Sequence, residues 1–193
     1  MKSVRSVLVC NGESNIRTSI KNKLNELGFC TIFECSNGKS AVTMACESQP
    51  DIAILDVPLP EMGGLNAARE IRQKQKIPVI LLLSPYDADT LSQANKIGIT
   101  TTLSKPFRGQ DLLPAIELAF VHAEEMERLK ADVKDLQQTI DNQEIIYKAK
   151  KVLMRSEGLS ESEAFRKIQK QAMDKKKCMR QIAETILVTD RVL

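Results

Sequence analysis

The stretch Asp51-Ile-Ala-Ile-Leu-Asp56, with the loop Val57-Pro-Leu-Pro-Glu-Met-Gly-Gly64 behind it, decides the fold of this chain. A short, continuous apolar run bounded by turn residues is typical of a strand that is buried on both faces of a parallel sheet. Helices must cover both faces of such a sheet, so strand and helix patterns should alternate along the neighbouring sequence.

Strand-like and helix-like patterns do alternate on both sides of this stretch. The helix pattern nearest the N-terminus places apolar residues at helical spacing and ends at Gly28, a residue suited to a helix C-cap. The sequence predicts strands at 4–10, 29–35, 51–55, 77–83 and 100–104, and helices at 13–27, 39–48, 65–74 and 87–97. This order is typical of the α/β class and predicts a doubly wound, five-stranded parallel sheet with helices on both faces.

Three polar residues follow the predicted strands at the points where the strands end. Asp56 follows the third strand, Ser84 the fourth and Lys105 the fifth. Ligands of doubly wound sheets bind beyond the carboxyl ends of the strands, so these side chains should share one pocket. The set suits a carboxylate that accepts a phosphoryl group, whose oxygens the ammonium and the hydroxyl would hold. The alternative is a plain salt bridge between Asp56 and Lys105 at the edge of the sheet.

Two segments of this region resemble response-regulator receivers. The loop from Leu55 to Gly64 resembles their phosphoacceptor loop, and Ser104-Lys105-Pro106-Phe107 resembles their lysine–proline–phenylalanine signature. The resemblance covers about residues 4–122 and implies a flavodoxin-like receiver domain in residues 1–122. It further implies that the aspartate is the phosphoacceptor position, the serine the switch hydroxyl and the lysine the phosphoryl contact.

The sequence departs from the receiver pattern around the expected metal site. Receivers usually carry two adjacent acidic residues after the first strand, which hold Mg²⁺; here those positions are Asn11 and Gly12, with Glu13 next. Only Asp56 and Glu13 could then hold the ion, so we expect no metal or a weak Mg²⁺ site. Thr102 replaces the aromatic residue usually found three positions before the lysine. These departures predict a degenerate receiver that is not switched by ordinary Mg²⁺-dependent phosphorylation.

A heptad repeat follows the fifth predicted strand. Apolar residues recur every seven positions from Leu112 to Tyr147, and a companion row follows three positions later. Two such rows form the a/d seam of a coiled coil, which predicts a linker helix at 112–147 continuous with the last receiver helix. We interpret the seam as a parallel homodimer contact, because no other segment is long enough to cover it; the alternative is a helix packed on its own chain. The predicted seam residues are Met126, Leu129, Val133, Leu136 and Ile140.

Residues 145–193 have the pattern of a three-helix bundle. Gly158 ends the long helix, and the capping box at 160–163 starts a second one. We assign Ala164, Phe165, Ile168 and Ala172 to its core face, and we expect a third helix at 179–188. With Phe165 in the core, no aromatic surface for stacking bases is expected.

The C-terminal segment also resembles a known module, the ANTAR domain of bacterial antitermination regulators. The resemblance implies binding of RNA hairpin loops in leader transcripts, and the whole layout resembles receiver–ANTAR regulators of the ethanolamine-utilisation type. Lys151 stands where the family usually has glycine, and Gln169 where it often has arginine. The segments that carry the resemblance are Lys148-Ala-Lys-Lys-Val-Leu-Met154, Leu159-Ser-Glu161, Ala164-Phe165, Ala172-Met173 and Ile182-Ala183.

The charge distribution agrees with an RNA partner. Residues 111–147 carry a net charge of −6, whereas residues 148–193 carry +6. A basic module suits a polyanion, and a solvated helical surface is the alternative. We expect polar and shape-based recognition of RNA. The candidate contacts are Lys148, Lys150, Lys151, Lys170, Lys175, Lys176, Lys177 and Arg180.

Other classes of function have little support. No apolar run approaches the roughly 18 residues that span a bilayer, so we expect a cytoplasmic protein without a membrane partner. The five cysteines form no C-x-x-C pair and His122 is the only histidine, which argues against zinc. No catalytic acid–base pair or phosphate-binding glycine loop is present, so we expect no enzyme.

Two alternatives to an RNA-binding regulator stay open. A DNA-binding response regulator would need a recognition helix, but the third C-terminal helix offers only Arg180 and Gln181 as base-reading side chains. A protein-interaction adaptor would be controlled by a bound protein instead of phosphorylation. The expected partners are therefore leader RNA, a second copy of the chain, and a sensor kinase or regulatory protein.

Overall fold

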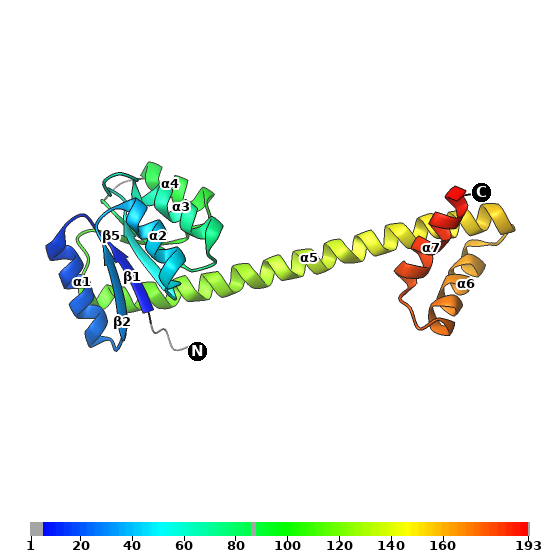
Figure 1. Cartoon of the computed structure of the whole chain (residues 1–193), viewed down its shortest axis with the longest axis horizontal. Coiled ribbons are helices and arrows are strands. Elements are labelled where there is room, and N and C mark those ends of the chain that lie inside the picture. Colours follow the sequence, from blue (N-terminus) through cyan, green and yellow to red (C-terminus); the bar gives the residue numbers. More distant parts are fainter. Residues whose placement is uncertain (1–5, 86–87, 193) are drawn as a thin grey trace. The chain divides into compact units, whose positions relative to one another are not determined.

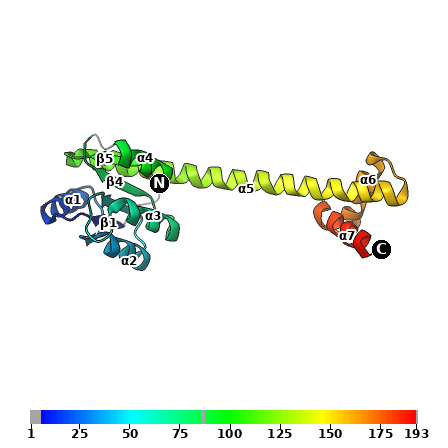
Figure 2. The same ribbon diagram turned by 90° about the horizontal axis from the view of Figure 1, so that it is seen from above.

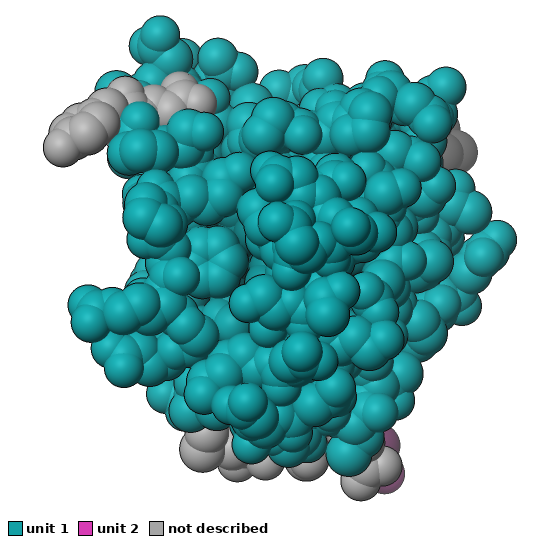
Figure 3. Space-filling model, turned by 90° about the vertical axis from the view of Figure 1, so that its left-hand side faces the viewer, with its two compact units in different colours: residues 1–127 teal, residues 128–193 magenta. Residues whose placement is uncertain are grey.

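A computed structural model describes residues 6–85 and 88–192 of the chain. The chain divides into two compact units, residues 1–127 and residues 128–193, and one face of the first unit is drawn in teal in Figure 3. The first two residues of the predicted strand at 4–10 and the first residue of the predicted helix at 87–97 lie outside the described residues.

The first unit is built on one parallel sheet in the strand order β2-β1-β3-β4-β5 (Figure 1). This arrangement confirms the predicted α/β class and the doubly wound five-stranded sheet. The strands are β1 (Ser6–Cys10), β2 (Thr31–Cys35), β3 (Ile52–Asp56), β4 (Val79–Leu83) and β5 (Thr101–Ser104). The helices are α1 (Ser14–Glu26), α2 (Gly38–Ser48), α3 (Gly64–Lys74), α4 (Ala88–Lys96), the short η1 (Gly109–Asp111) and the start of α5 (Leu112–Glu157).

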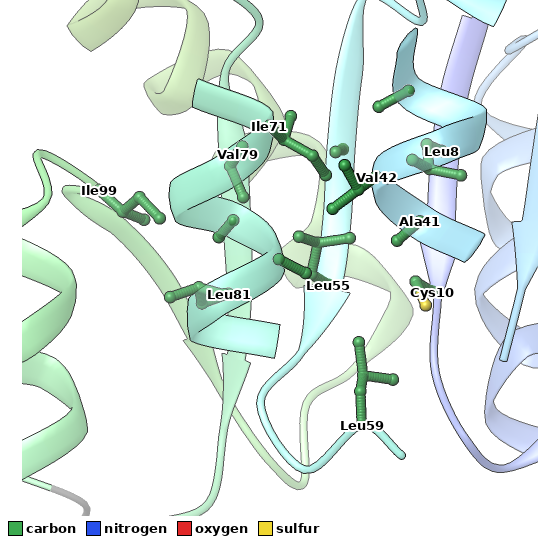
Figure 4. Close-up of a cluster of buried hydrophobic side chains, with 14 of the residues drawn as sticks. Leu8, Cys10, Ala41, Val42, Leu55, Leu59, Ile71, Val79, Leu81 and Ile99 are labelled. Carbon is green, nitrogen blue, oxygen red and sulfur yellow. The ribbon is translucent and has the colours of Figure 1, made fainter. Parts of the chain in front are cut away.

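The sheet has a separate apolar layer on each face. Every residue of β3 and β4 is buried, as expected for central strands of a parallel sheet. Alternate side chains of these strands point to opposite faces. One face packs against α2, α3 and α4, and Figure 4 shows this cluster around Leu55 and Leu81. The other face packs against α1 and the first turns of α5.

Two glycines bring the loop after β3 close to its neighbours. A Cβ atom at Gly64 would lie 1.8 Å from the carbonyl oxygen of Asp56, and one at Gly38 would lie 1.9 Å from that of Met62. Neither position tolerates a side chain, because Cβ atoms do not approach backbone oxygens this closely. The loop therefore folds tightly back over the end of β3, where Asp56 lies.

Helix α5 is continuous for 46 residues and contributes to both units. Its first turns pack on the sheet through Leu112, Ala115, Ile116 and Ala119. Each residue from 124 to 141 is exposed, so this part of the apolar seam is not covered by its own chain. No helix in the described part of the chain is long and apolar enough to cross a membrane.

The second unit packs the end of α5 against α6 (Glu161–Asp174) and α7 (Met179–Val192), which lie side by side in Figures 1 and 2. The core residues are Ala149, Leu153, Ala164, Ile168, Ala172, Ile182 and Ala183. Gly158, with a φ of 68°, separates α5 from α6, and Ser160 and Glu163 form the predicted capping box.

The prediction that Phe165 belongs to the core of this unit is wrong. Phe165 is 42% exposed and is not part of the buried cluster. The buried face of α6 is the narrow row Ala164, Ile168 and Ala172, whose members are four residues apart. Phe165 follows Ala164 by one residue, about 100° around the helix, so it lies outside this row.

Candidate functional site

The carboxyl ends of β1, β3 and β5 bring three polar side chains into contact. The Lys105 ammonium donates to both carboxylate oxygens of Asp56, at 2.8 and 3.1 Å. The Asn11 amide nitrogen donates to the same carboxylate at 2.7 Å. The backbone N–H of Val57 adds a fourth bond at 3.1 Å. Asp56, at the end of β3, therefore lies among donors supplied by the ends of two other strands and by its own loop.

The Asn11 side chain is held in one orientation from both ends. Its amide oxygen accepts a hydrogen bond from the backbone N–H of Glu13 at 2.8 Å, while its nitrogen donates to Asp56. The Arg17 guanidinium donates to the Asn11 backbone carbonyl at 2.7 Å. The amide thus presents its donor side to the aspartate, and its oxygen is already occupied.

The pocket is shielded from water to different degrees at its two charges. The Asp56 side chain is only 3% exposed, whereas that of Lys105 is 21% exposed. A buried carboxylate needs a charged partner and hydrogen bonds, because desolvation disfavours its charged form. Lys105 and Asn11 supply these contacts within the chain.

The other predicted pocket residues lie around this contact. Ser84 is exposed directly after β4, the strand between β3 and β5. Gly12 and Glu13 are exposed after β1, and the Glu13 side chain makes no capping bond to α1. Thr102 is half-buried within β5. Within the described ranges, no group of three or more His, Cys, Asp or Glu residues could hold a metal ion.

A buried thiol pair beside the pocket was not predicted. Cys10 and Cys35 are Cα partners on β1 and β2, and the Asn11 backbone N–H donates to the Cys35 carbonyl at 3.2 Å. The Cys10 thiol donates to the Asn37 carbonyl at 3.3 Å. The interaction with the Cys35 thiol raises the pKa of Cys10, as does burial, and the same interaction lowers the pKa of Cys35. The two cysteines each close a predicted strand, which is the signal that could have paired them.

The candidate RNA-binding residues of the second unit form two groups, according to whether they form ion pairs. Lys148 pairs with Glu144 at 2.6 Å, Lys150 with Glu161 at 2.6 Å, and Arg180 with Glu184 at 2.8 Å. The bond to Glu184 raises the pKa of Arg180. The other group is exposed and forms no ion pair with any described residue: Lys151, Lys170, Lys175, Lys176 and Lys177.

Exposed aromatic rings lie among these cations. Tyr147 is 48% exposed, and the ammonium groups of Lys150 and Lys151 lie 5.7 and 4.7 Å from its ring centre. Phe165 lines a shallow hollow together with Lys150, Glu161 and Ser162. Aromatic surface is thus available on this unit, contrary to the expectation from the sequence.

Comparison with protein families and curated proteins agrees with this geometry. The response regulator receiver domain matches residues 7–117, and the ANTAR domain matches residues 134–187. The transcriptional regulatory protein PdtaR of Mycobacterium tuberculosis is 35% identical over 185 residues, which are 96% of this chain and 90% of that protein. The regulatory protein AtoC of Escherichia coli is 27% identical over 142 residues, which are 72% of this chain and 30% of that protein.

Solved structures resemble the first unit. The receiver domain of a modulated diguanylate cyclase from Desulfovibrio desulfuricans is 25% identical, with a TM-score of 0.57, and the match covers 64% of this chain and 99% of that one. The chemotaxis response regulator CheY4 of Vibrio cholerae shares the fold at 21% identity, with a TM-score of 0.54, over 61% of this chain and 99% of that one. The chain therefore belongs to the response regulator receiver family and carries an ANTAR domain at its C-terminal end.

Proposed function

We propose that this chain is an RNA-binding transcription antiterminator that recognises hairpins in leader transcripts through residues 145–193. The observation that carries the proposal is the group of exposed lysines without ion-pair partners among the described residues, located on the unit that matches the ANTAR domain. Cations that no carboxylate neutralises are available to phosphates, and each contact releases counterions from the RNA. Its layout resembles antiterminators of the ethanolamine-utilisation type.

The domain limits proposed from the sequence fit this role. We take residues 1–122 as the receiver, 112–147 as the linker helix and 145–193 as the RNA-binding domain. The receiver would bind a sensor kinase or another regulatory protein, and the proposal assigns no enzymatic reaction to the chain.

We infer that the receiver pocket does not hold Mg²⁺ as phosphorylated receivers do. Mg²⁺ in proteins takes oxygen ligands in near-octahedral geometry, usually with one or two carboxylates. The amide of Asn11 turns a nitrogen toward Asp56, and Gly12 has no side chain. Asp56 keeps the phosphoacceptor position, but Lys105 and Asn11 already neutralise and bind its carboxylate.

The inference about the pocket predicts a negative result with phosphoryl donors. Acetyl phosphate or beryllofluoride with Mg²⁺ should leave the intact mass and the receiver NMR spectrum unchanged. A phosphoryl adduct that is present in the wild type and absent in Asp56→Asn would contradict it.

The exposed seam of α5 supports a parallel homodimer. The side chains of Leu129, Val133, Leu136 and Ile140 are between 47% and 65% exposed in the single chain. Such a continuous apolar stripe at heptad spacing is unfavourable in water until a partner helix covers it. A dimer would present two RNA-binding domains, which suits paired hairpins and raises their effective affinity.

An electrophoretic mobility-shift assay tests the proposed function. Leader-type RNA hairpins should shift at much lower protein concentration than duplex DNA of the same length, at one fixed salt concentration. Equal or tighter binding of duplex DNA would instead support a DNA-binding response regulator.

A further inference from the structure

The aromatic side chains of this protein are exposed unevenly. In the first unit, the described aromatic residues are buried or half-buried: Phe29, Phe33, Phe107 and Phe120. In the second unit, Tyr147 and Phe165 are 48% and 42% exposed. Single exposed apolar residues are common, so exposure alone does not indicate a site. The surroundings of Phe165 decide what its ring can do.

Phe165 forms one wall of the hollow that it shares with Lys150, Glu161 and Ser162. The hollow therefore combines a flat apolar face with a hydroxyl, a carboxylate and an ammonium. An unpaired nucleobase has the matching surface, because its faces stack on aromatic rings and its edges form hydrogen bonds.

The polar side of the hollow is fixed within the unit. The Lys150 ammonium lies 2.6 Å from a Glu161 carboxylate oxygen, and the Lys150 side chain is only 16% exposed. The same ammonium lies 5.7 Å from the centre of the Tyr147 ring. The contact with Lys150 lowers the pKa of Glu161, so the carboxylate stays charged and bound to Lys150. It also offsets the negative charge that would otherwise repel RNA beside Phe165.

Exposed cations on the same helices can contact the RNA backbone. Lys151 follows Lys150 on α5, and Lys170 is on α6 with Phe165; neither forms an ion pair with a described residue. Each of the two helices that form the hollow thus also carries a lysine that could bind a phosphate of the same RNA. Phe165 lies on α6, whereas the predicted dimer seam lies on α5, so this wall does not belong to the heptad rows.

We propose that the hollow of Lys150, Glu161, Ser162 and Phe165 binds one unpaired base of an RNA loop, which stacks on the Phe165 ring. The inference rests on the proposed function and adds a loop-specific contact to the lysine–phosphate attraction. Lys150 then acts as a positioning residue that orders the hollow through Glu161.

The test uses the full-length protein and a hairpin that the wild type selects from a pool with a randomised loop. Fluorescence titrations with 2-aminopurine at each loop position report stacking, and a blunt duplex with the same stem serves as reference. Phe165→Leu keeps an apolar side chain but removes the aromatic face, whereas Phe165→Trp keeps a stacking surface. Met173→Ala removes another exposed apolar side chain of α6 and is the matched control.

We expect Phe165→Leu to weaken hairpin binding about tenfold and to abolish the fluorescence change at one loop position. Phe165→Trp and Met173→Ala should keep both signals, with unchanged circular dichroism in all three variants. Wild-type affinity and fluorescence in Phe165→Leu would overturn the inference and leave the proposed function intact. A changed dimer mass in Phe165→Leu with unchanged hairpin affinity would also overturn it, because the ring would then contact a second copy. Equal wild-type binding of hairpin and duplex would overturn the proposed function itself.

Discussion

The pocket of the first unit and the surface of the second unit differ in whether their charged side chains are paired within the chain. Asp56 is buried, and its carboxylate is bound by Lys105 and Asn11 of the same chain. On the second unit, Lys170 and Lys175–Lys177 are exposed and form no ion pair with a described residue. In the first site the carboxylate is paired within the chain, whereas in the second site no described carboxylate pairs with these ammonium groups. We infer from this difference that the receiver pocket is stabilised internally, whereas the proposed RNA surface is available to a ligand.

The largest effect should follow from placing charges in the exposed apolar seam. Leu129→Asp with Leu136→Asp would put four carboxylates into the core of the proposed dimer, where unpaired charges are strongly unfavourable. We expect the protein to become monomeric, as measured by multi-angle light scattering. The bivalent gain in RNA affinity should disappear with the dimer.

A matched control places the same charges on the outer face of the helix. Ala131→Asp with Gln138→Asp changes two exposed positions that are two residues further along than the seam positions and share their seven-residue spacing. This variant should keep the dimer mass of the wild type. Unchanged mass in the Leu129 and Leu136 variant would exclude the seam as the dimer interface.

The next largest effect should come from breaking the buried pair of the receiver. Lys105→Met leaves the Asp56 carboxylate buried without its cation, which costs about 3 kcal/mol of folding free energy. Lys21→Met is the control, because the ion pair of Lys21 with Glu34 is 2.5 Å long but more exposed than the pocket pair, with side chains 44% and 29% exposed. Urea unfolding should show a change of at most about 1 kcal/mol for the control. Similar losses in both variants would mean that the pocket does not depend on internal charge pairing.

A smaller effect should mark the lysines without partners. Replacing Lys175, Lys176 and Lys177 by Ala should weaken RNA binding and flatten the log–log salt dependence by about two units, if all three contact phosphates of a single-stranded loop. The thermal midpoint should change little, because exposed lysines contribute little to folding. Lys39, Lys96 and Lys134 are exposed outside this group, and their triple alanine variant removes the same charge. An equal change of slope in both variants would indicate nonspecific attraction instead of a defined RNA surface.

The sequence predicted the elements whose evidence is local. Apolar runs were sufficient to predict the five strands, and helical spacing predicted the helices between them. The positions of the strand ends indicated that Asp56 and Lys105 would lie together. The orientation of Asn11 could not be predicted, because it depends on a backbone N–H of one loop and a carboxylate from another strand. The side of the helix on which Phe165 lies was also misjudged. A small bundle buries only a narrow row of α6, and sequence alone does not give the width of that row.

The smallest predicted effect concerns the capping box that starts α6. The Glu163 carboxylate accepts hydrogen bonds from the Ser160 hydroxyl at 2.6 Å and from the Ser160 backbone N–H at 2.9 Å, and these bonds lower the pKa of Glu163. A carboxyl whose pKa is lower in the folded state contributes stability above its ordinary pKa of 4.5. That contribution is lost as the pH falls below this value and through the lowered pKa. Amide hydrogen exchange in the first turn of α6 should therefore accelerate relative to the rest of the helix on acidification. In Glu163→Gln the protection should be weaker near neutral pH and should change less on acidification, since Gln does not titrate.

The contact of Glu161 with Lys150 is lost in the same direction, so some acid response will persist in the variant. Ser156→Ala removes a hydroxyl that bonds the Val152 carbonyl within α5 and should leave the acid response of α6 as in the wild type. An acid response in Glu163→Gln as steep as in the wild type would show that the capping box does not set the pH dependence of this helix end.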